Sequence, residues 1–214
     1  MSIRDHISRR SNYEQTLDFI PTPPYATRVL FEYVAPSMKA QAPEMTMWDP
    51  ACGAGHMCTV FEEYGAKSIA SDVHFYGFSD TRIQDFVAPS LLDCYKDADA
   101  IVTNPPYAKL NKFMIEGLDR SKRHFALLTR IQALEGQNRH KDVFSKAPPT
   151  TVAVFSDRIP FKSGEVVRKV SKMFTHCWLY WDMEVVRSGA GYEPKITWVP
   201  VEAQQNLEKD EDYA

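Results

Sequence analysis

The stretch Trp48-Asp49-Pro50-Ala51-Cys52-Gly53-Ala54-Gly55-His56 decides the fold of this chain. It ends an apolar run at residues 45–48 that is typical of a buried strand, and it leads into residues 56–64, which predict a helix. Gly53 and Gly55 suit the turn between them, because glycine tolerates positive φ and lets the backbone approach a ligand closely. The stretch therefore predicts a strand, a glycine-containing turn and a helix in direct succession.

Strands and helices alternate through the rest of the chain. Further strands are predicted at residues 67–72, 98–103, 124–129 and 151–155, and helices at residues 25–34, 109–122, 131–144 and from Ser90 onward. Residues 158–173 are expected to form a basic loop, and the last two strands, residues 176–181 and 195–199, a hairpin around Gly189-Ala190-Gly191. This alternation predicts an α/β fold, with a mainly parallel sheet, helices on both faces and one antiparallel strand near the end.

Size and composition fit one globular domain. The 214 residues suffice for a single core, 44% of them are hydrophobic, and no apolar run approaches the length of a membrane span. The N-terminus shows no apolar signal region and the four cysteines form no C-x-x-C pair, so we expect a cytoplasmic protein without a metal site. We expect residues 1–18 to be a flexible arm, residues 19–203 to be one domain and residues 204–214 to be an acidic tail. Three late tryptophans are expected in the core: Trp178, Trp181 and Trp198.

Charge is distributed unevenly along the chain, although the formal net charge is only −3. Residues 109–172 contain fourteen basic and six acidic side chains, so this part carries an excess of eight positive charges and the rest is strongly acidic. Such asymmetry can form a basic face for a polyanion, and the alternative is a set of ordinary solvated helix faces.

Polar side chains follow three of the predicted strands. Asp49, Asp72 and Asn104 each come where a strand ends, and ligands of open parallel sheets bind outside the carboxyl ends of the strands. The turn lacks the third glycine of a dinucleotide site, since Cys58 stands there, and it lacks the Gly-Lys-Ser/Thr of a phosphate loop. Asp49 suits an ammonium group, and Asp72, about twenty residues after the turn, suits the two hydroxyls of a ribose. Together these features favour a nucleoside that bears an amino acid, which describes S-adenosylmethionine.

The tetrapeptide Asn104-Pro105-Pro106-Tyr107 predicts the chemistry at the other side of the site. The side-chain oxygen of Asn104 and the backbone carbonyl of Pro105 can accept the two hydrogens of a planar amino group, which stabilises positive charge as that nitrogen is alkylated. The prolines hold these acceptors in place, because each fixes its own φ. Tyr107 offers a ring on which a flipped base can stack, with Phe155 or Phe161 as a candidate for its other face.

The glycine turn followed by Asn-Pro-Pro-Tyr resembles the S-adenosylmethionine-dependent DNA adenine-N6 methyltransferases, and the late segment is similar to small members from phages or prophages. The resemblance covers nearly all of residues 19–182. It implies a Rossmann-like class I methyltransferase fold, with a mainly parallel seven-stranded sheet and an antiparallel C-terminal strand. It implies that Asn104, Pro105, Pro106 and Tyr107 are catalytic. The cofactor-binding residues it implies are Thr22, Pro23, Asp49, Ala51, Gly53, Gly55, Asp72, Asp85 and Phe86. Cys52 and His56 are interpreted as bystanders.

One departure from that family concerns target recognition, because we expect residues 19–203 to form a catalytic domain without a separate recognition domain. We therefore expect DNA binding with low or short sequence selectivity, or a specificity partner or homodimer. The residues expected to grip the substrate are Lys109, Arg158, Lys162, Arg168 and Lys169. RNA adenine and protein glutamine remain alternative substrates, and an inactive cofactor-binding subunit that presents nucleic acid to a partner is an alternative of another class.

Overall fold

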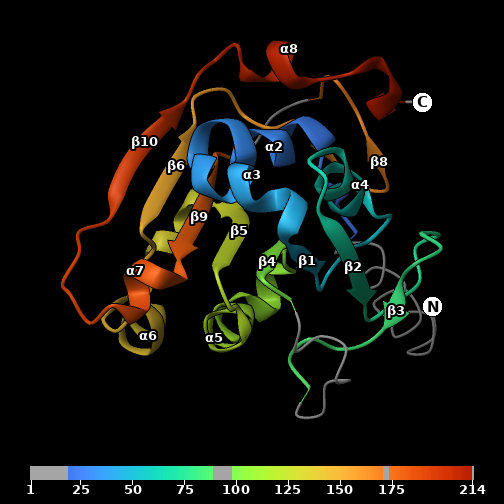
Figure 1. Cartoon of the computed structure of the whole chain (residues 1–214). Helices are drawn as coiled ribbons and strands as arrows, with labels where there is room; N and C mark the ends of the chain where they lie inside the picture. Colours follow the sequence, from blue (N-terminus) through green and yellow to red (C-terminus); the bar gives the residue numbers. More distant parts are fainter. Residues whose placement is uncertain (1–18, 89–97, 171–173, 214) are drawn as a thin grey trace, which may run out of the picture.

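Eight strands form one sheet at the centre of the molecule (Figure 1). The computed structural model describes residues 19–88, 98–170 and 174–213. The strand order is β10-β6-β9-β5-β4-β1-β2-β3, and β9 runs antiparallel to both of its neighbours while the other pairs are parallel. The bounds are β1 Thr46–Asp49, β2 Lys67–Asp72, β3 Arg82–Ile83, β4 Ala100–Thr103, β5 His124–Arg130, β6 Thr151–Phe155, β9 His176–Asp182 and β10 Lys195–Val199.

The predicted fold class is confirmed, but the end of the sheet differs from the prediction. The sheet has eight strands instead of seven, and β9 and β10 form no hairpin because β6 lies between them. Six of the seven residues of β9 are buried, which fits a strand inserted between two others. Most residues of β10 are exposed or half-buried, which fits its place at the edge, where it pairs parallel to β6. The antiparallel strand is therefore the seventh of eight in the sheet's chain order, and the C-terminal strand is parallel.

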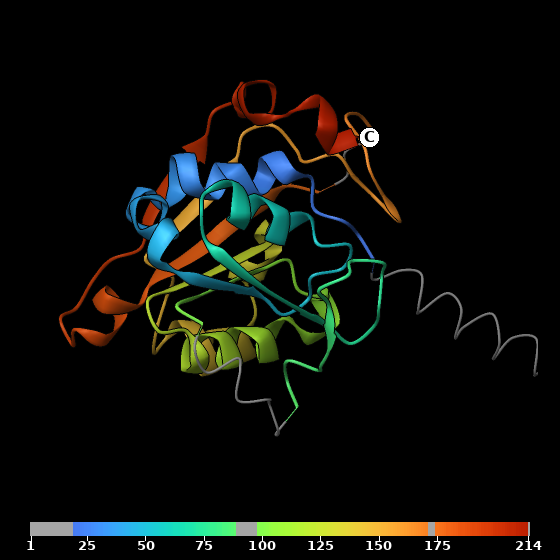
Figure 2. The same ribbon diagram turned by 45° about the vertical axis from the view of Figure 1, so that its right-hand side comes forward.

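Helices cover both faces of the sheet, as Figures 1 and 2 show. On one face, α2, its continuation η1 and α4 contribute side chains to one buried cluster with the sheet, and on the other face α5 contributes to a second. The helical segments are α2 Pro24–Val29, η1 Leu30–Val34, α3 Pro36–Gln41, η2 Ala42–Glu44, α4 His56–Glu63, η4 Tyr107–Lys109, α5 Leu110–Arg120, η5 Ile131–Leu134, α6 Gln137–Arg139, η6 His140–Phe144, α7 Met183–Arg187, α8 Ala203–Leu207 and η7 Asp210–Tyr213. Among the helices described, we find none that is both long and apolar enough to cross a membrane.

Two predicted elements are replaced by shorter ones. The helix expected over residues 131–144 is divided into η5, α6 and η6, because Gly136 adopts a φ of +115° between the first two. The loop expected over residues 158–173 contains a short antiparallel hairpin made of β7 (Phe161–Lys162) and β8 (Glu165–Val166). The expected arm at residues 1–18, the helix from Ser90 and Cys94 lie outside the described residues.

The three late tryptophans divide between core and surface. Trp178 and Trp181 are fully buried, and their indole nitrogens donate to the backbone carbonyls of Ala26 (2.9 Å) and Ala147 (3.0 Å). Trp198 lies on the edge strand and is 66% exposed, so its expected place in the core is wrong. An edge strand has no neighbour on its outer side to cover its side chains, which explains the difference.

A buried ion cluster attaches the last described residues to the domain. The guanidinium of Arg28 on α2 is almost fully buried and donates two hydrogen bonds to Glu63 and two to Asp212, at 2.7 to 2.8 Å. It also donates to the carbonyl oxygen of Leu207 at 2.8 Å. The acidic segment after residue 203 therefore packs on α2 as far as Asp212.

Candidate functional site

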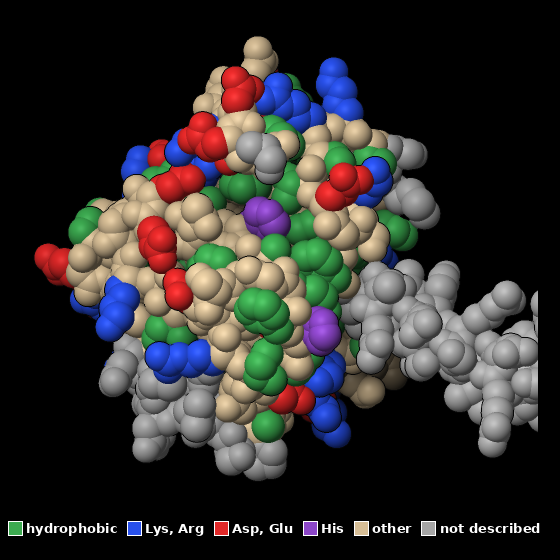
Figure 3. Space-filling model, turned by 90° about the vertical axis from the view of Figure 1, so that its right-hand side faces the viewer, with side chains coloured by type: hydrophobic (Ala, Val, Ile, Leu, Met, Phe, Trp, Pro, Cys, Tyr) green, Lys and Arg blue, Asp and Glu red, His purple; other side chains and the backbone are tan. Residues whose placement is uncertain are grey.

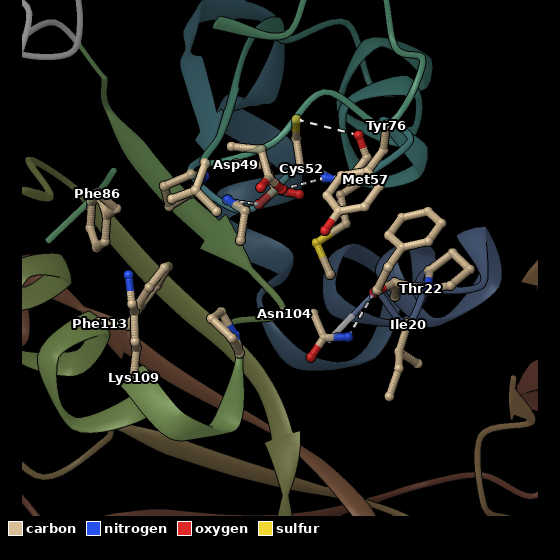
Figure 4. A pocket seen from close by; sticks show the side chains of 18 of the residues that line it. Ile20, Thr22, Asp49, Cys52, Met57, Tyr76, Phe86, Asn104, Lys109 and Phe113 are labelled. Carbon is tan, nitrogen blue, oxygen red and sulfur yellow. Dashed lines mark hydrogen bonds between the residues drawn. The ribbon is translucent and has the colours of Figure 1, made fainter. Parts of the chain in front are cut away.

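A pocket opens where β1, β2 and β4 end, at the carboxyl edge of the sheet (Figure 4). Five segments surround it: the strap at residues 19–22, residues 49–57 from the end of β1, residues 72–76 from the end of β2, residues 85–86 after β3, and residues 104–113 after β4. Its lining is Phe19, Ile20, Pro21, Thr22, Asp49, Pro50, Ala51, Cys52, Gly53, His56, Met57, Asp72, Val73, Tyr76, Asp85, Phe86, Asn104, Pro106, Ala108, Lys109 and Phe113. The pocket thus joins side chains that lie as many as 94 residues apart in the sequence.

The turn after β1 requires both of its glycines. Gly53 and Gly55 adopt φ angles of +52° and +81°, which side chains other than glycine rarely adopt. A Cβ added to Gly53 would lie 2.8 Å from the ring of Phe19, and one added to Gly55 would lie 2.3 Å from the ring of Phe78. The turn is therefore held in a shape that lets aromatic side chains pack directly on its backbone.

Two buried carboxyl groups lie at the floor of the pocket. Asp49 is 2% exposed and accepts a hydrogen bond from the backbone N–H of Ala51 at 3.1 Å. Asp72 accepts from the N–H of Gly53 at 2.9 Å and from that of His74 at 3.2 Å. Burial raises the pKa of Asp49 to about 7, with a further contribution from the negative charge of Asp72, whose own pKa burial also raises. A cation in the pocket would relieve this unfavourable burial of negative charge.

The apolar end of the pocket is formed around Phe86. This ring is fully buried and lies edge-on to Trp48, with centroids 5.1 Å apart, and 4.9 Å from the ring of Phe113. The neighbouring Asp85 forms an ion pair with Lys109 at 3.1 Å and accepts from the N–H of Val87. The loop after β3 is thereby connected to the segment after β4, which closes this end.

Asn104 projects from the end of β4 and is oriented by Thr22. Its Nδ2 donates to Oγ1 of Thr22 at 3.1 Å, and Figure 4 shows the side-chain oxygen on the side away from that bond. Thr22 is buried and does not cap α2, whose N-cap is Pro23 without a side-chain bond. The strap therefore fixes the amide so that its oxygen remains available as an acceptor.

Tyr107 lies beside the pocket rather than in its lining. Its hydroxyl is 3.2 Å from Nε2 of His176 on β9, and the guanidinium of Arg130 lies 4.2 Å from its ring centroid. Burial raises the pKa of Tyr107, and the positive charge of Arg130 opposes the shift. Phe161 on β7 lies edge-on to His176, with centroids 4.6 Å apart, whereas Phe155 is buried in the core. Tyr107, His176 and Phe161 thus form an aromatic cluster outside the pocket lining.

The structure brings together most of the predicted site residues, but four of the five basic ones lie outside the pocket lining. The predicted residues that line the pocket are Thr22, Asp49, Ala51, Gly53, Asp72, Asp85, Phe86, Asn104, Pro106 and Lys109. Those outside its lining are Pro23, Gly55, Pro105, Tyr107, Arg158, Lys162, Arg168 and Lys169. Lys109 pairs with Asp85, Lys162 with Glu165, and Arg168 with Asp210, so three of the expected substrate contacts already have acidic partners. On the face in Figure 3, hydrophobic side chains gather at the centre, and basic and acidic ones are interspersed around them.

Sequence reasoning missed the aromatic cover of the pocket. Phe19 and Tyr76 stack face to face, with centroids 4.3 Å apart and planes at 8°. Cys52 and His56, interpreted as bystanders, also line the pocket. A signal for Phe19 exists in the sequence, because it directly precedes the strap that carries Thr22, whereas Tyr76 lies in a loop without a recognisable pattern. Among the described residues, no group of three or more His, Cys, Asp or Glu side chains is arranged to hold a metal ion.

Comparisons with known proteins identify the fold. No protein-family model matches the chain, and no curated protein matches it in sequence. Among solved structures, a protein described as a modification subunit of a type I restriction enzyme from Vibrio vulnificus matches 95% of this chain and 55% of its own, with 13% identity and a TM-score of 0.54. The type IIG restriction endonuclease BpuSI matches 87% of this chain and 28% of its own, with 13% identity and a TM-score of 0.57. A protein described as an RNA methyltransferase from Pyrococcus horikoshii matches 76% of this chain and 86% of its own, with 15% identity and a TM-score of 0.51.

The chain has a Rossmann-like methyltransferase fold. It spans about half the length of the first of these proteins and about a quarter of the second. At these identities the likeness establishes the architecture, whereas the chemistry depends on the residues of the pocket.

Proposed function

We propose that this chain transfers a methyl group from S-adenosylmethionine to the exocyclic N6 amino group of adenine in DNA. The observation that carries the proposal is the position of Asn104. Its amide is oriented by Thr22 and lines the same pocket as Asp49, Asp72 and Gly53. A hydrogen-bond acceptor for an amino group therefore adjoins a cavity whose buried carboxyl groups favour a cationic ligand.

The floor of the pocket fits the charged and hydroxylated parts of this cofactor. Asp49 would bind the ammonium group, whose positive charge compensates a buried carboxylate. Asp72 would accept from the ribose hydroxyls with the lone pairs that Gly53 and His74 leave unused. Phe86 and Asp85 would border the adenine ring at the apolar end, and Thr22 and Ala51 would shape the walls, with Pro23 and Gly55 next to them in the chain but outside the lining. When bound, the cofactor supplies an electrophilic methyl group on sulfur.

The residues after β4 would orient the adenine amino group, which is the nucleophile. The side-chain oxygen of Asn104 and the backbone carbonyl of Pro105 would accept the two hydrogens of the adenine amino group, so that its nitrogen lone pair is directed at the methyl carbon. The new N–C bond forms as the C–S bond breaks, and the extra proton then leaves to solvent. Pro106 restricts the backbone, and Tyr107 offers its ring to the extruded base.

DNA is favoured over the alternative substrates by two observations. Two of the solved structures with this fold are described as parts of restriction systems, which act on DNA. The segment that follows Asn104 also carries the excess of eight positive charges. RNA adenine and protein glutamine would suit the same tetrapeptide, and one solved structure with this fold is described as an RNA methyltransferase.

A second candidate of another class is an inactive cofactor-binding subunit. The pocket argues against it, because Asn104 retains a hydrogen-bonding partner that orients it, which a site without chemistry does not need. Transfer of tritiated methyl groups to duplex DNA, single-stranded DNA, RNA and protein separates these possibilities. The proposal expects label in DNA and N6-methyladenine after its digestion to nucleosides and mass analysis. Cofactor binding without label in any acceptor would establish the inactive subunit instead.

A further inference from the structure

Arg130 lies against the ring of Tyr107, on which the target base is proposed to stack. It is the last residue of β5, the strand next to β4, so it emerges at the same edge of the sheet as Asn104. Its guanidinium lies 4.2 Å from the ring centroid of Tyr107 and 3.7 Å from that of Phe174. Both distances are within the range of cation–π contact, so the aromatic cluster contains a positive charge.

In the part of the chain that the structure describes, the charge of Arg130 has no acidic neighbour. Within residues 19–88, 98–170 and 174–213, no carboxylate forms an ion pair with Arg130, and its buried Nε has no hydrogen-bond acceptor. His176, its neighbour across the sheet, does not supply a counter-charge. Burial, and then the charge of Arg130, lowers the pKa of His176 to about 4, so this ring is neutral at pH 7.

Other arginines that are shielded from solvent in this chain are satisfied. Arg28 binds two carboxylates, Arg120 binds Glu116, and Arg139 donates to an asparagine oxygen and to two backbone carbonyls. Arg130 has a side-chain hydrogen bond with Tyr107, but no carboxylate or carbonyl partner is found for it among the described residues, and its buried Nε–H loses water without gaining an acceptor, which carries a cost. The difference indicates that an external anion completes the coordination of Arg130.

We propose that Arg130 binds a backbone phosphate next to the nucleotide whose base is held at Tyr107. The proposal rests on the proposed function and specifies how its substrate is held. The rings of Tyr107 and Phe174 restrict the guanidinium, whose planar N–H groups suit a phosphate oxygen. In return, the charge stacked on Tyr107 fixes the ring that the base contacts. Arg130 is a binding and positioning residue here, while Asn104 contacts the reacting nitrogen.

The test uses a short duplex that contains a single adenine, in which one phosphate at a time is replaced by an uncharged methylphosphonate. For the wild-type protein, replacement of the phosphate that Arg130 binds should weaken binding about tenfold or more, because a charge-assisted hydrogen bond is lost. Arg130→Gln should show the weaker binding already with unmodified DNA and little further loss on replacement. Arg130→Lys should keep part of the effect, since it retains the charge without the planar stacking.

Arg123→Gln is the matched control, because Arg123 is exposed and precedes the opposite end of β5. It removes the same charge and should leave the methylphosphonate effect unchanged. Thermal unfolding and cofactor affinity of each variant establish that it is folded. If wild type and Arg130→Gln lose the same factor at every replaced phosphate, the proposal is overturned.

The binding measurement needs no turnover, so it separates this proposal from the proposed function. A wild-type protein that binds the duplex with the expected phosphate effect but methylates no adenine supports the role of Arg130 and refutes the reaction. Methylation of adenine without any phosphate effect supports the reaction and refutes the role of Arg130.

Discussion

The two halves of the pocket are built in different ways. The side proposed for the cofactor, called the donor side, consists of buried carboxyl groups and glycines. Backbone hydrogen bonds fix their positions, such as that from Gly53 to Asp72 at 2.9 Å. The side proposed for the substrate base, called the target side, consists of half-buried rings. Three of its predicted basic contacts, Lys109, Lys162 and Arg168, are paired with acids. Backbone hydrogen bonds hold the groups of the donor side, whereas on the target side three of the five predicted basic contacts already have acidic partners.

The difference between the two sides determines where selectivity for the ligands is expected. Buried polar groups discriminate strongly, because a ligand that does not pair with them leaves them unsatisfied. Exposed ion pairs contribute little to binding energy. We therefore expect this chain to be strict about its methyl donor and about the amino group that Asn104 receives, and permissive about the surrounding sequence.

Removal of the Asn104 amide should have the largest effect and should act on turnover alone. Loss of one preorganised acceptor in a shielded site costs about 100- to 1,000-fold in rate. Asn104→Ala should therefore lower turnover by that factor while cofactor affinity changes less than about threefold. Asn138→Ala, at an exposed asparagine on α6, is the control and should retain full activity. A parallel loss of cofactor affinity would show that Asn104 belongs to the donor side.

Gly55→Ala should damage the donor side through its backbone. The new Cβ would approach the ring of Phe78 to 2.3 Å, at a φ of +81°. Overpacking together with the left-handed backbone should lower the free energy of unfolding by about 2–4 kcal/mol. Denaturant unfolding measures this loss, and calorimetric titration should show weaker cofactor binding. Gly191→Ala lies in open space and should change neither quantity. Equal stability of both variants would refute the fixed turn.

Cofactor affinity should depend on pH through Asp49. Its carboxyl pKa is raised to about 7 in the folded protein, so the group is protonated below that pH and must lose its proton to bind an ammonium. Affinity should therefore fall with decreasing pH from 7.5 to 5.5, at most about tenfold per unit. Titration calorimetry across this range measures the slope, and Asp49→Asn should remove it while weakening binding at pH 7.5.

The raised pKa of Asp49 also predicts how the stability of the ligand-free protein depends on pH. Between the unfolded pKa of Asp49, near the ordinary value of 3.8, and its folded pKa of about 7, the folded state holds the extra proton. This contribution to stability is present at low pH and is lost as pH rises toward 7. For the affinity prediction, cofactor binding by the wild type that stays constant between pH 7.5 and 5.5 would contradict a role for Asp49 in binding the ammonium.

Lys162 should show the smallest effect. It already pairs with Glu165 on the exposed β7–β8 hairpin, so Lys162→Gln should weaken DNA binding by only about twofold at moderate salt. Glu165→Gln releases the lysine and should strengthen DNA binding by a similar factor. Filter binding at several salt concentrations measures both. A tenfold loss for Lys162→Gln would mean that the target side relies on surface charge after all.

The donor side was predictable from the sequence because its signals are local. The turn at residues 49–56 lies within one strand–helix unit, and Asp72 ends the next strand, so the periodic pattern alone placed both at one edge. The tetrapeptide at residues 104–107 follows a buried strand, so the same pattern placed it at that edge as well. The order of the strands β9, β6 and β10 was not predictable in this way, because a strand's pattern of burial does not specify its neighbour.

The target side was less predictable because its contacts are distant in sequence. Tyr107 and His176 are separated by 69 residues, and the bond from Asn104 to Thr22 spans 82. Charge counting predicted a basic face, but it does not show which lysines find acidic partners. The pairing of Arg168 with Asp210 depends on the fold of the C-terminal segment over α2.

The ion cluster at Arg28 has a consequence for local unfolding. The counter-charges of this buried guanidinium lie 35 and 184 residues away, on α4 and on η7. Detachment of η7 would leave Arg28 with a single acidic partner in a shielded place, so fraying of that segment costs more than its few exposed contacts suggest. Amide hydrogens of η7 and of α2 should accordingly exchange with solvent at coupled rates, and Glu63→Gln should accelerate both together.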